Sequence, residues 1–322
     1  MDQRRLGRTG LYVSRLALGT MTWGRDTDED DAAAQLSTFL DAGGTLVDTA
    51  DVYVDGESER ILGRLLRDGS HRERVVLATK AVSVRGGDRR RDASRRHLLA
   101  ALDASLERLQ TAYVDLWQLH AYDPDTPLDE TLAALDAAVS SGRARYVGIS
   151  NYNGWQTAKA ATWQQAWPGR APIVSTQMEY SLLQRGIERE VLPAAMDLGV
   201  GVLPWSPLGR GVLTGKYREG TPADSRGASP QYSRFVQPYL GERADRIVGA
   251  VLTAADGLGV SPVAVALAWA RDRPGVVAPI VGARTAGQLA GSLDAENVVL
   301  PAEIVAALDD VSAPRRSYPE HF

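Results

Sequence analysis

Short apolar runs alternate with amphipathic or alanine-rich stretches along the whole chain. The apolar runs have the length of buried strands, and the stretches between them repeat apolar positions with the spacing of a helix face. The predicted strands cover residues 15–18, 46–48, 75–79, 114–120, 146–150, 173–179, 201–206 and 276–281. The predicted helices cover residues 28–42, 57–66, 94–109, 128–140, 154–166, 187–198 and 286–293. Alternation of this kind indicates a parallel sheet, which is either open and doubly wound or closed into a barrel.

Two features favour the closed barrel. The alternation continues from end to end without a change of composition or a linker, so we expect a single domain over residues 1–322. The glycine-rich stretches at residues 199–204 and 209–214 lack the third glycine of the dinucleotide-binding pattern, which disfavours a Rossmann domain. We therefore expect an α/β fold of the (β/α)8 TIM-barrel type.

Four segments lie outside the eight repeated units. Residues 4–14 have the pattern of a β-hairpin, which could plug the bottom of a barrel. Residues 261–271 begin with a Ser-Pro pair typical of a helix start, and residues 301–311 form a last predicted helix. Residues 207–241 are rich in glycine, proline, serine and arginine, so we expect either a functional loop or a partly disordered segment there.

Composition and charge exclude several classes of function. The formal net charge of −4 argues against nucleic acid and anionic membranes as partners. The absence of cysteine excludes cysteine-ligated zinc, iron–sulfur clusters and a thiol nucleophile. No stretch is long and apolar enough to span a membrane, and no signal peptide is recognisable at the start, so we expect a soluble, cytoplasmic protein. The oligomeric state stays open.

Polar residues close most of the apolar runs. In a parallel barrel the carboxyl ends of all strands meet on one face, and catalytic groups there come from several strands. The residues at these ends are Asp48, Lys80, His120, Ser150 with Asn151, Gln177 and Trp205. They follow one another at intervals of about one strand–helix unit, which predicts a shared site on that face.

Four side chains carry candidate chemistry. A buried carboxylate at Asp48 needs a cation, and Lys80 can supply it. The ammonium group would lower the pKa of the nearby Tyr53 phenol and make it a proton donor. Considered one at a time, these residues also fit purely structural roles. Asp48 could cap a turn, Lys80 could lie on the surface, and Tyr53 could be a packed aromatic residue. His120 could be a core histidine whose hydrogen bonds are satisfied. No second histidine or carboxylate pair completes a metal site, so we expect no metal.

Several ordered motifs carry a wider resemblance. They are residues 47–53 (VDTADVY), 78–80 (ATK), 105–109 (SLERL), 115–120 (DLWQLH), 148–151 (GISN), 177–182 (QMEYSL) and 205–211 (WSPLGRG). With these motifs the chain resembles the aldo-keto reductase superfamily, in particular the bacterial branch related to the β-subunits of voltage-gated potassium channels. The resemblance covers nearly the whole length and implies a (β/α)8 barrel that binds NADPH in an extended pose.

The resemblance also implies a mechanism and a catalytic tetrad of Asp48, Tyr53, Lys80 and His120. An aldehyde or ketone would accept a hydride from C4 of the nicotinamide while Tyr53 protonates its oxygen. Lys80, held by Asp48, would lower the pKa of Tyr53. His120 would orient the carbonyl group through a hydrogen bond. The protein supplies position and electrostatics, and the cofactor supplies the hydride chemistry.

The cofactor contacts are implied by the same resemblance. The nicotinamide carboxamide would bind Ser150, Asn151 and Gln177, and its ring would stack on Trp205. The implied pyrophosphate contacts are Ser206, Leu208, Gly211 and Lys216, with Arg226 as a clamp. The implied contacts at the adenosine end are Arg284, for the 2′-phosphate, and Gln288. Further implied contacts are Gly19, Thr20, Met21, Asp48, Pro207, Gly209, Gly282 and Ser292. Several relatives carry Glu and Asn where this chain has Gly291 and Ser292, which weakens the prediction for adenine.

Three functions follow from these observations. The first is an NADPH-dependent carbonyl reductase acting on a small molecule. The second is an NADP(H)-binding regulatory or redox-sensing subunit with little turnover, and the third is another barrel enzyme such as a phosphosugar isomerase. The substrate would depend on loops that carry Trp23, Tyr122 and residues 231–239. Those aromatics suggest an apolar or planar substrate, although core or loop packing explains them equally well.

Overall fold

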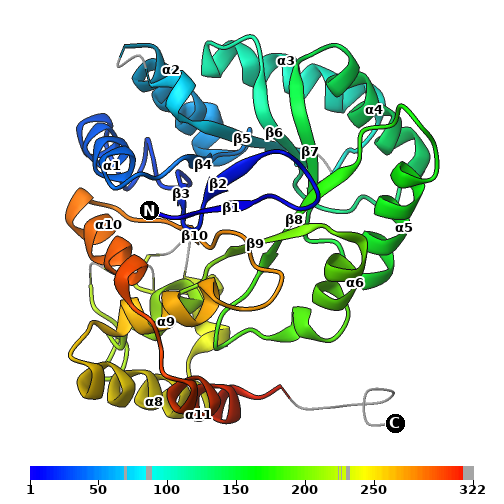
Figure 1. Ribbon diagram of the computed structural model, residues 1–322. Coiled ribbons are helices and arrows are strands. Elements are labelled where there is room, and N and C mark those ends of the chain that lie inside the picture. The colour runs from blue at the N-terminus through cyan, green and yellow to red at the C-terminus, as the bar shows by residue number, and fades with distance from the viewer. Residues whose placement is uncertain (69–70, 85–88, 224, 226, 230–232, 315–322) are drawn as a thin grey trace, which may run out of the picture.

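The computed structural model describes residues 1–68, 71–84, 89–223, 225, 227–229 and 233–314. A barrel of eight parallel strands forms the centre, in the order β10-β3-β4-β5-β6-β7-β8-β9 (Figure 1). The strands are β3 (Ala17–Gly19), β4 (Leu46–Asp48), β5 (Val76–Ala81), β6 (Val114–Leu119), β7 (Ala144–Ser150), β8 (Ile173–Glu179), β9 (Gly201–Trp205) and β10 (Ile280–Val281). A parallel bridge between Val202 and Val276 brings the segment before β10 against β9, so the sheet nearly closes on itself. The predicted barrel is confirmed.

Helices surround the barrel on its outer side (Figure 1). Those that follow strands are α1 (Glu29–Asp41), α2 (Glu57–Asp68), α3 (Arg95–Leu109), α4 (Leu128–Ser140), α5 (Gly154–Gln165), α6 (Val191–Leu198) and α10 (Ala286–Leu293). The additional helices are α7 (Ser233–Val236), α8 (Glu242–Leu258), α9 (Pro262–Arg271) and α11 (Ala302–Ser312). Short 3-10 turns are η1 (Tyr53–Gly56), η2 (Arg72–Arg74), η3 (Gly186–Glu188), η4 (Gly209–Thr214), η5 (Gln237–Tyr239) and η6 (Asp294–Asn297).

Several element bounds shift by a few residues, and two larger differences from the sequence prediction occur. The last strand is only Ile280–Val281 instead of residues 276–281, because Pro279 has no N–H to donate to a neighbouring strand. Helix α8 was not predicted, although its buried residues recur at helical spacing. They are Ala244, Ile247, Val248, Val251 and Ala255. This apolar stripe packs α8 against α9 and α11.

The N-terminal hairpin closes one end of the barrel, as predicted. Its strands, β1 (Gln3–Arg5) and β2 (Tyr12–Ser14), pair antiparallel and lie across the barrel in Figure 1. Leu6 and Val13 from this hairpin join the apolar cluster inside the barrel. Gly7 approaches the strands so closely that an added Cβ would lie 2.5 Å from the carbonyl oxygen of Val174.

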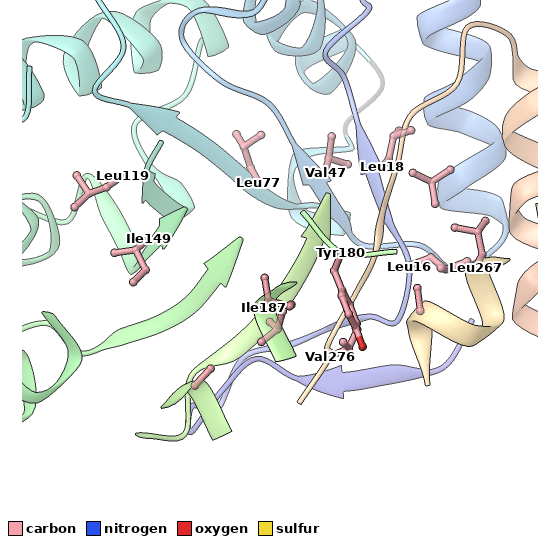
Figure 2. Close-up of a cluster of buried hydrophobic side chains, with 14 of the residues drawn as sticks. Leu16, Leu18, Val47, Leu77, Leu119, Ile149, Tyr180, Ile187, Leu267 and Val276 are labelled. Carbon is pink, nitrogen blue, oxygen red and sulfur yellow. The ribbon is translucent and has the colours of Figure 1, made fainter. Parts of the chain in front are cut away.

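Alternation along each strand separates an inner from an outer core. Leu18, Val47 and Leu77 lie side by side on β3, β4 and β5 and belong to the large cluster that packs the helices against the strands (Figure 2). Their strand neighbours Leu46 and Ala78 belong to the inner cluster. Residues two positions further along a strand return to the same face. Asp48, two positions after Leu46, and Lys80, two positions after Ala78, therefore point into the barrel.

No single helix in the described ranges is both long and apolar enough to cross a membrane. Helices α8 and α9 reach that length and composition only as a pair, with a bend of 103° between them.

Candidate active site

A cavity of about 690 Å³ opens at the carboxyl ends of the barrel strands. Most of the residues predicted from the sequence line it. They are Gly19, Met21, Asp48, Tyr53, His120, Ser150, Asn151, Gln177, Trp205, Ser206, Pro207, Leu208, Gly211, Lys216, Gly282, Arg284, Gln288 and Ser292. Residues separated by more than two hundred positions in the chain thus share one wall.

Three predicted site residues that the structure describes are not part of this lining. Lys80 is fully buried beneath it. Thr20 is also buried, and its hydroxyl group donates to the backbone oxygen of Asp48. Gly209 is buried against Leu183. Arg226 lies outside the described residues.

Asp48 and Lys80 form a buried ion pair at the floor of the cavity. The ammonium Nζ donates to Oδ2 of Asp48 at 2.6 Å and to the backbone oxygen of Thr49 at 2.7 Å. Oδ1 of Asp48 accepts hydrogen bonds from the amide groups of Gln118, at 3.2 Å, and Gln177, at 2.9 Å. Burial lowers the pKa of Lys80, but the Asp48 and Tyr53 oxygens outweigh it and leave the pKa raised. Lys80 therefore stays charged at neutral pH.

Gln177 and Gln118 have roles that the sequence analysis did not anticipate. Gln177 lines the cavity as predicted, yet its amide nitrogen is committed to Asp48. Gln118 was not predicted at all. Gln118 lies two positions from Leu116 and two from His120, so the alternation along a strand places its side chain on the same inward face. This spacing could have identified it.

The Tyr53 hydroxyl lies 3.3 Å from Nζ of Lys80, and the ammonium group is 5.0 Å from the centre of the ring. The predicted contact between phenol and ammonium is therefore present. The predicted fall of the pKa is not: burial raises the pKa of Tyr53, and Lys80 lowers it by less. Transferring a phenolate out of water raises its free energy by more than the attraction to the Lys80 ammonium lowers it, because Asp48 already neutralises much of the lysine charge. Tyr53 is therefore protonated at neutral pH and available as a donor.

His120 stands beside Tyr53 with the two rings edge to face and their centres 6.0 Å apart. Burial, together with the charge of Lys80, lowers the pKa of His120 to about 3. The imidazole is consequently neutral and carries one N–H donor. Its Nδ1 atom is buried without a hydrogen-bond partner among the described residues. A neutral imidazole at this place can donate a hydrogen bond into the cavity.

The turn that carries Tyr53 is strained. After β4 the chain passes through Val54, Asp55 and Gly56 with φ angles of 49°, 56° and 82°. A β-branched residue with positive φ is uncommon and unfavourable, since its side chain crowds the backbone. Three left-handed residues in succession reverse the chain so that α2 can begin at Glu57. The strain is located directly next to the candidate proton donor.

Replacing Val54 by glycine should relieve part of this strain. We expect Val54→Gly to raise the free energy of unfolding by about 1 kcal/mol, because glycine adopts φ near 49° without a steric penalty. The loss of half-buried side-chain contacts opposes this gain. Urea unfolding followed by circular dichroism measures the difference. A lower stability than wild type would show that the contacts of Val54 outweigh the strain.

The polar side chains at the rim are tied to one another. Nε1 of Trp205 donates to Oδ1 of Asn151 at 3.1 Å, and Nδ2 of Asn151 donates to the backbone oxygen of His120 at 2.9 Å. The Ser150 hydroxyl donates to the backbone oxygen of Gln177 at 2.8 Å. These bonds join the ends of β6, β7, β8 and β9 and hold the indole ring of Trp205 at the cavity wall.

The part of the cavity away from the barrel axis suits an anionic ligand. Lys216 and Arg284 line it, and Gly211, with φ of 91°, brings bare backbone to the same wall. Among the described lining residues the only carboxylate is Asp48, which Lys80 neutralises. The ammonium group of Lys216 and the guanidinium group of Arg284 at this wall favour phosphate groups, as a dinucleotide phosphate would present. No three His, Asp or Glu side chains gather as metal ligands in the described part of the chain.

The substrate side of the cavity differs from the sequence prediction. Trp23 is fully buried, with its Nε1 bonded to Gln35, and it does not line the cavity. Tyr122 packs against Tyr152 and Trp155 instead. Of the predicted segment 231–239, residues 231 and 232 lie outside the described residues, and Phe235 lines the cavity. Further lining residues that sequence reasoning missed are Arg210, Thr214, Ser261, Val263, Ile280, Val281, Ala283 and Gly291.

Comparison with known proteins gives consistent results. The sequence profile described as "Aldo/keto reductase family" matches residues 15–313. An uncharacterized oxidoreductase of Bacillus subtilis is 39% identical and covers 97% of this chain and 96% of its own. A probable voltage-gated potassium channel subunit beta of Oryza sativa is 37% identical over 98% of this chain and 99% of its own. The versiconal hemiacetal acetate reductase of Aspergillus parasiticus is 34% identical over 99% of each chain.

Proposed function

Because the chain belongs to the aldo/keto reductase family, we propose that it is an NADP-dependent oxidoreductase that reduces an aldehyde or ketone to the alcohol. One observation carries the proposal. The Tyr53 hydroxyl lies 3.3 Å from an ammonium group that a buried carboxylate holds, at the floor of a cavity large enough for a cofactor and a substrate. Neutral His120 stands beside it.

NADPH fits the chemistry of the lining. Lys216 and Arg284 would bind its phosphate groups, and the Trp205 ring offers a flat surface for the nicotinamide. Asn151 and Ser150 lie at the same rim and provide amide and hydroxyl groups for the carboxamide. When bound, the cofactor supplies a hydride to the carbonyl carbon.

Proton transfer to the carbonyl oxygen is the task of the protein. Tyr53 is protonated at neutral pH and donates its proton to the oxygen as negative charge develops there. Lys80 remains charged next to the phenol and stabilises the phenolate that results, while Asp48 holds the ammonium in place. His120 donates a hydrogen bond to the same oxygen and orients it. A proton donor of this kind typically contributes about 10² to 10⁴ in rate.

The direct test measures NADPH oxidation with a panel of aldehydes, ketones and quinones. We expect the absorbance of NADPH to fall only when both the protein and a carbonyl compound are present. Quenching of tryptophan fluorescence reports NADPH binding independently, since Trp205 lines the cavity. Binding without turnover of any carbonyl compound would contradict the enzymatic proposal.

Arg284 should decide between the two nicotinamide dinucleotides. A planar guanidinium group suits the 2′-phosphate, which NADH lacks. We expect Arg284→Ala to weaken NADPH binding by about 10 to 100-fold and NADH binding by far less, because a hydrogen-bonded charge pair contributes about 1.5–3 kcal/mol. Fluorescence titration measures both dissociation constants. An equal loss for the two cofactors would assign Arg284 a structural role.

A second candidate is an NADP(H)-binding regulatory or redox-sensing subunit with little turnover. It is favoured by the two plant relatives whose names describe probable voltage-gated potassium channel β-subunits, 37% and 34% identical to this chain. In that case NADPH would bind tightly and be oxidised at a negligible rate. The presence of Tyr53, Lys80 and His120 together favours the reductase.

A further inference from the structure

Three aromatic rings and one guanidinium group form a cluster at the edge of the cavity. Trp205 and Phe235 both line the cavity, and their rings are parallel to within 9° with centres 6.2 Å apart. Tyr239 lies behind them and is almost fully buried. Arg210 contacts all three rings, at 5.8 Å, 3.3 Å and 4.7 Å from the respective ring centres. We call Trp205, Phe235, Tyr239 and Arg210 the aromatic wall.

Arg210 holds this wall in place. Its guanidinium group makes a two-pronged ion pair with Glu179 at the end of β8, with both bonds 2.9 Å long. It also donates to the backbone oxygen of Phe235 and lies over the ring of that residue. Arg210 therefore joins a rigid barrel strand to α7, the short helix that carries Phe235.

The conformation of Arg210 indicates that this placement is enforced. Its φ of 60° lies in the left-handed region, which costs a non-glycine residue about 1–2 kcal/mol. Gly209 and Gly211 on either side are left-handed too, so the chain loops back and directs the arginine toward β8. The ion pair with Glu179 and the contact with Phe235 offset the strain.

Charge pairing makes the wall apolar toward a ligand. The Arg210 and Glu179 side chains are only 10% and 16% exposed and neutralise each other. The guanidinium group covers one face of the Phe235 ring, so a ligand in the cavity meets the remaining ring surface. A charged carboxylate or phosphate substituent would lose hydration here without gaining a cation.

We propose that the aromatic wall is the specificity determinant of this site: Trp205 is left to the nicotinamide, and the Phe235 ring beside it selects carbonyl substrates with a planar aromatic substituent. Arg210 is the positioning residue that keeps Phe235 in contact range. The inference rests on the proposed reductase function and adds the substrate class. Flat rings gain about 0.5–1.5 kcal/mol from aromatic packing beyond the area they bury, which an aliphatic chain does not gain.

The test compares kcat/KM for benzaldehyde and for propanal with saturating NADPH. We expect Phe235→Ala to lower the ratio of the two values by about 10 to 100-fold, mainly through a higher KM for benzaldehyde, because a phenyl contact surface is lost. Phe235→Tyr, which keeps the ring, should retain the wild-type ratio. Arg210→Lys keeps the charge but loses the planar fork, and it should lower the ratio by about 5-fold or more although Phe235 is intact.

Trp163 provides the matched control. It is 41% exposed on α5, and Arg170 lies 4.9 Å from its ring centre, so it repeats the pairing of arginine and aromatic ring outside the cavity. Trp163→Ala should leave the ratio within about twofold of wild type. The proposal is overturned if Phe235→Ala also keeps the wild-type ratio, or if Trp163→Ala lowers it as strongly.

A binding measurement separates this inference from the proposed function. Ligand-observed NMR compares benzyl alcohol and propanol on the NADPH-loaded protein, and it requires no turnover. We expect wild type to bind benzyl alcohol at least about 10-fold more tightly and Phe235→Ala to lose that preference. If no carbonyl compound is reduced and this preference is nonetheless present, the reductase proposal fails. The proposal that the aromatic wall selects aromatic ligands is then still supported. Equal binding of the two alcohols by the wild-type protein would overturn the proposal that the aromatic wall selects aromatic substrates.

Discussion

Tyr53→Phe should lower the rate of carbonyl reduction by about 10² or more while leaving NADPH affinity nearly unchanged. The phenylalanine ring fills the same space and keeps the edge contact with His120. It removes the hydroxyl that lies 3.3 Å from Lys80 and with it the proton for the carbonyl oxygen. Steady-state rates and fluorescence titration with NADPH give the two quantities. Activity equal to wild type would remove Tyr53 as the acid.

The pH dependence gives the same prediction a second readout. Burial raises the pKa of Tyr53 above its ordinary value of 10, so the proton is present throughout the range from neutral to moderately alkaline pH. Reduction should therefore show no loss from this group between about pH 7 and 9 and should decline only when the phenol ionises. Tyr122→Phe is the control, since Tyr122 lies outside the cavity lining and should leave the rate unchanged.

Lys80→Met should destabilise the protein by about 3–5 kcal/mol and abolish most of the activity. The substitution leaves the Asp48 carboxylate buried without its cation, because Lys80 is fully buried and Asp48 only 3% exposed. Asp48→Asn combined with Lys80→Met should recover much of the lost stability, since no unpaired charge then remains. The double variant should stay inactive.

Denaturant unfolding measures these free energies. Lys159, exposed on α5, is the control, and Lys159→Met should change the stability by less than about 0.5 kcal/mol. If the single variant is as stable as the double variant, Asp48 has taken up a proton or reached water. The ion pair would then not be the structural support of the site.

Much of the fold was predictable because it depends on local patterns. The inward positions Leu46 and Ala78 precede Asp48 and Lys80 by two residues, so the alternation of a strand already assigns the polar pair to the barrel interior. Helix α8 has a pattern that is harder to recognise in the sequence. Its apolar stripe was present, but alanine and glycine between the larger residues obscure the pattern.

The site was predictable to a similar degree. The strand-end rule brings Asp48, Lys80 and His120 to one face, and in the structure Lys80 and His120 lie beside Tyr53. Trp23 looked equally suitable as a cavity residue, yet it is buried in the core. An aromatic residue in a loop carries no signal for whether it faces the cavity or the core, because both places favour it.

The amino-acid order alone assigns the strands, the barrel and the polar residues at its mouth, since each follows from periods of two or about 3.6 residues. The folded chain alone decides which way each pKa moves and which side chains touch. Burial of Tyr53 outweighs its cation, Gln177 turns to Asp48, and Arg210 joins Glu179 to Phe235 across the cavity edge. Desolvation and contact depend on three-dimensional surroundings, and residues distant in the chain supply most of these.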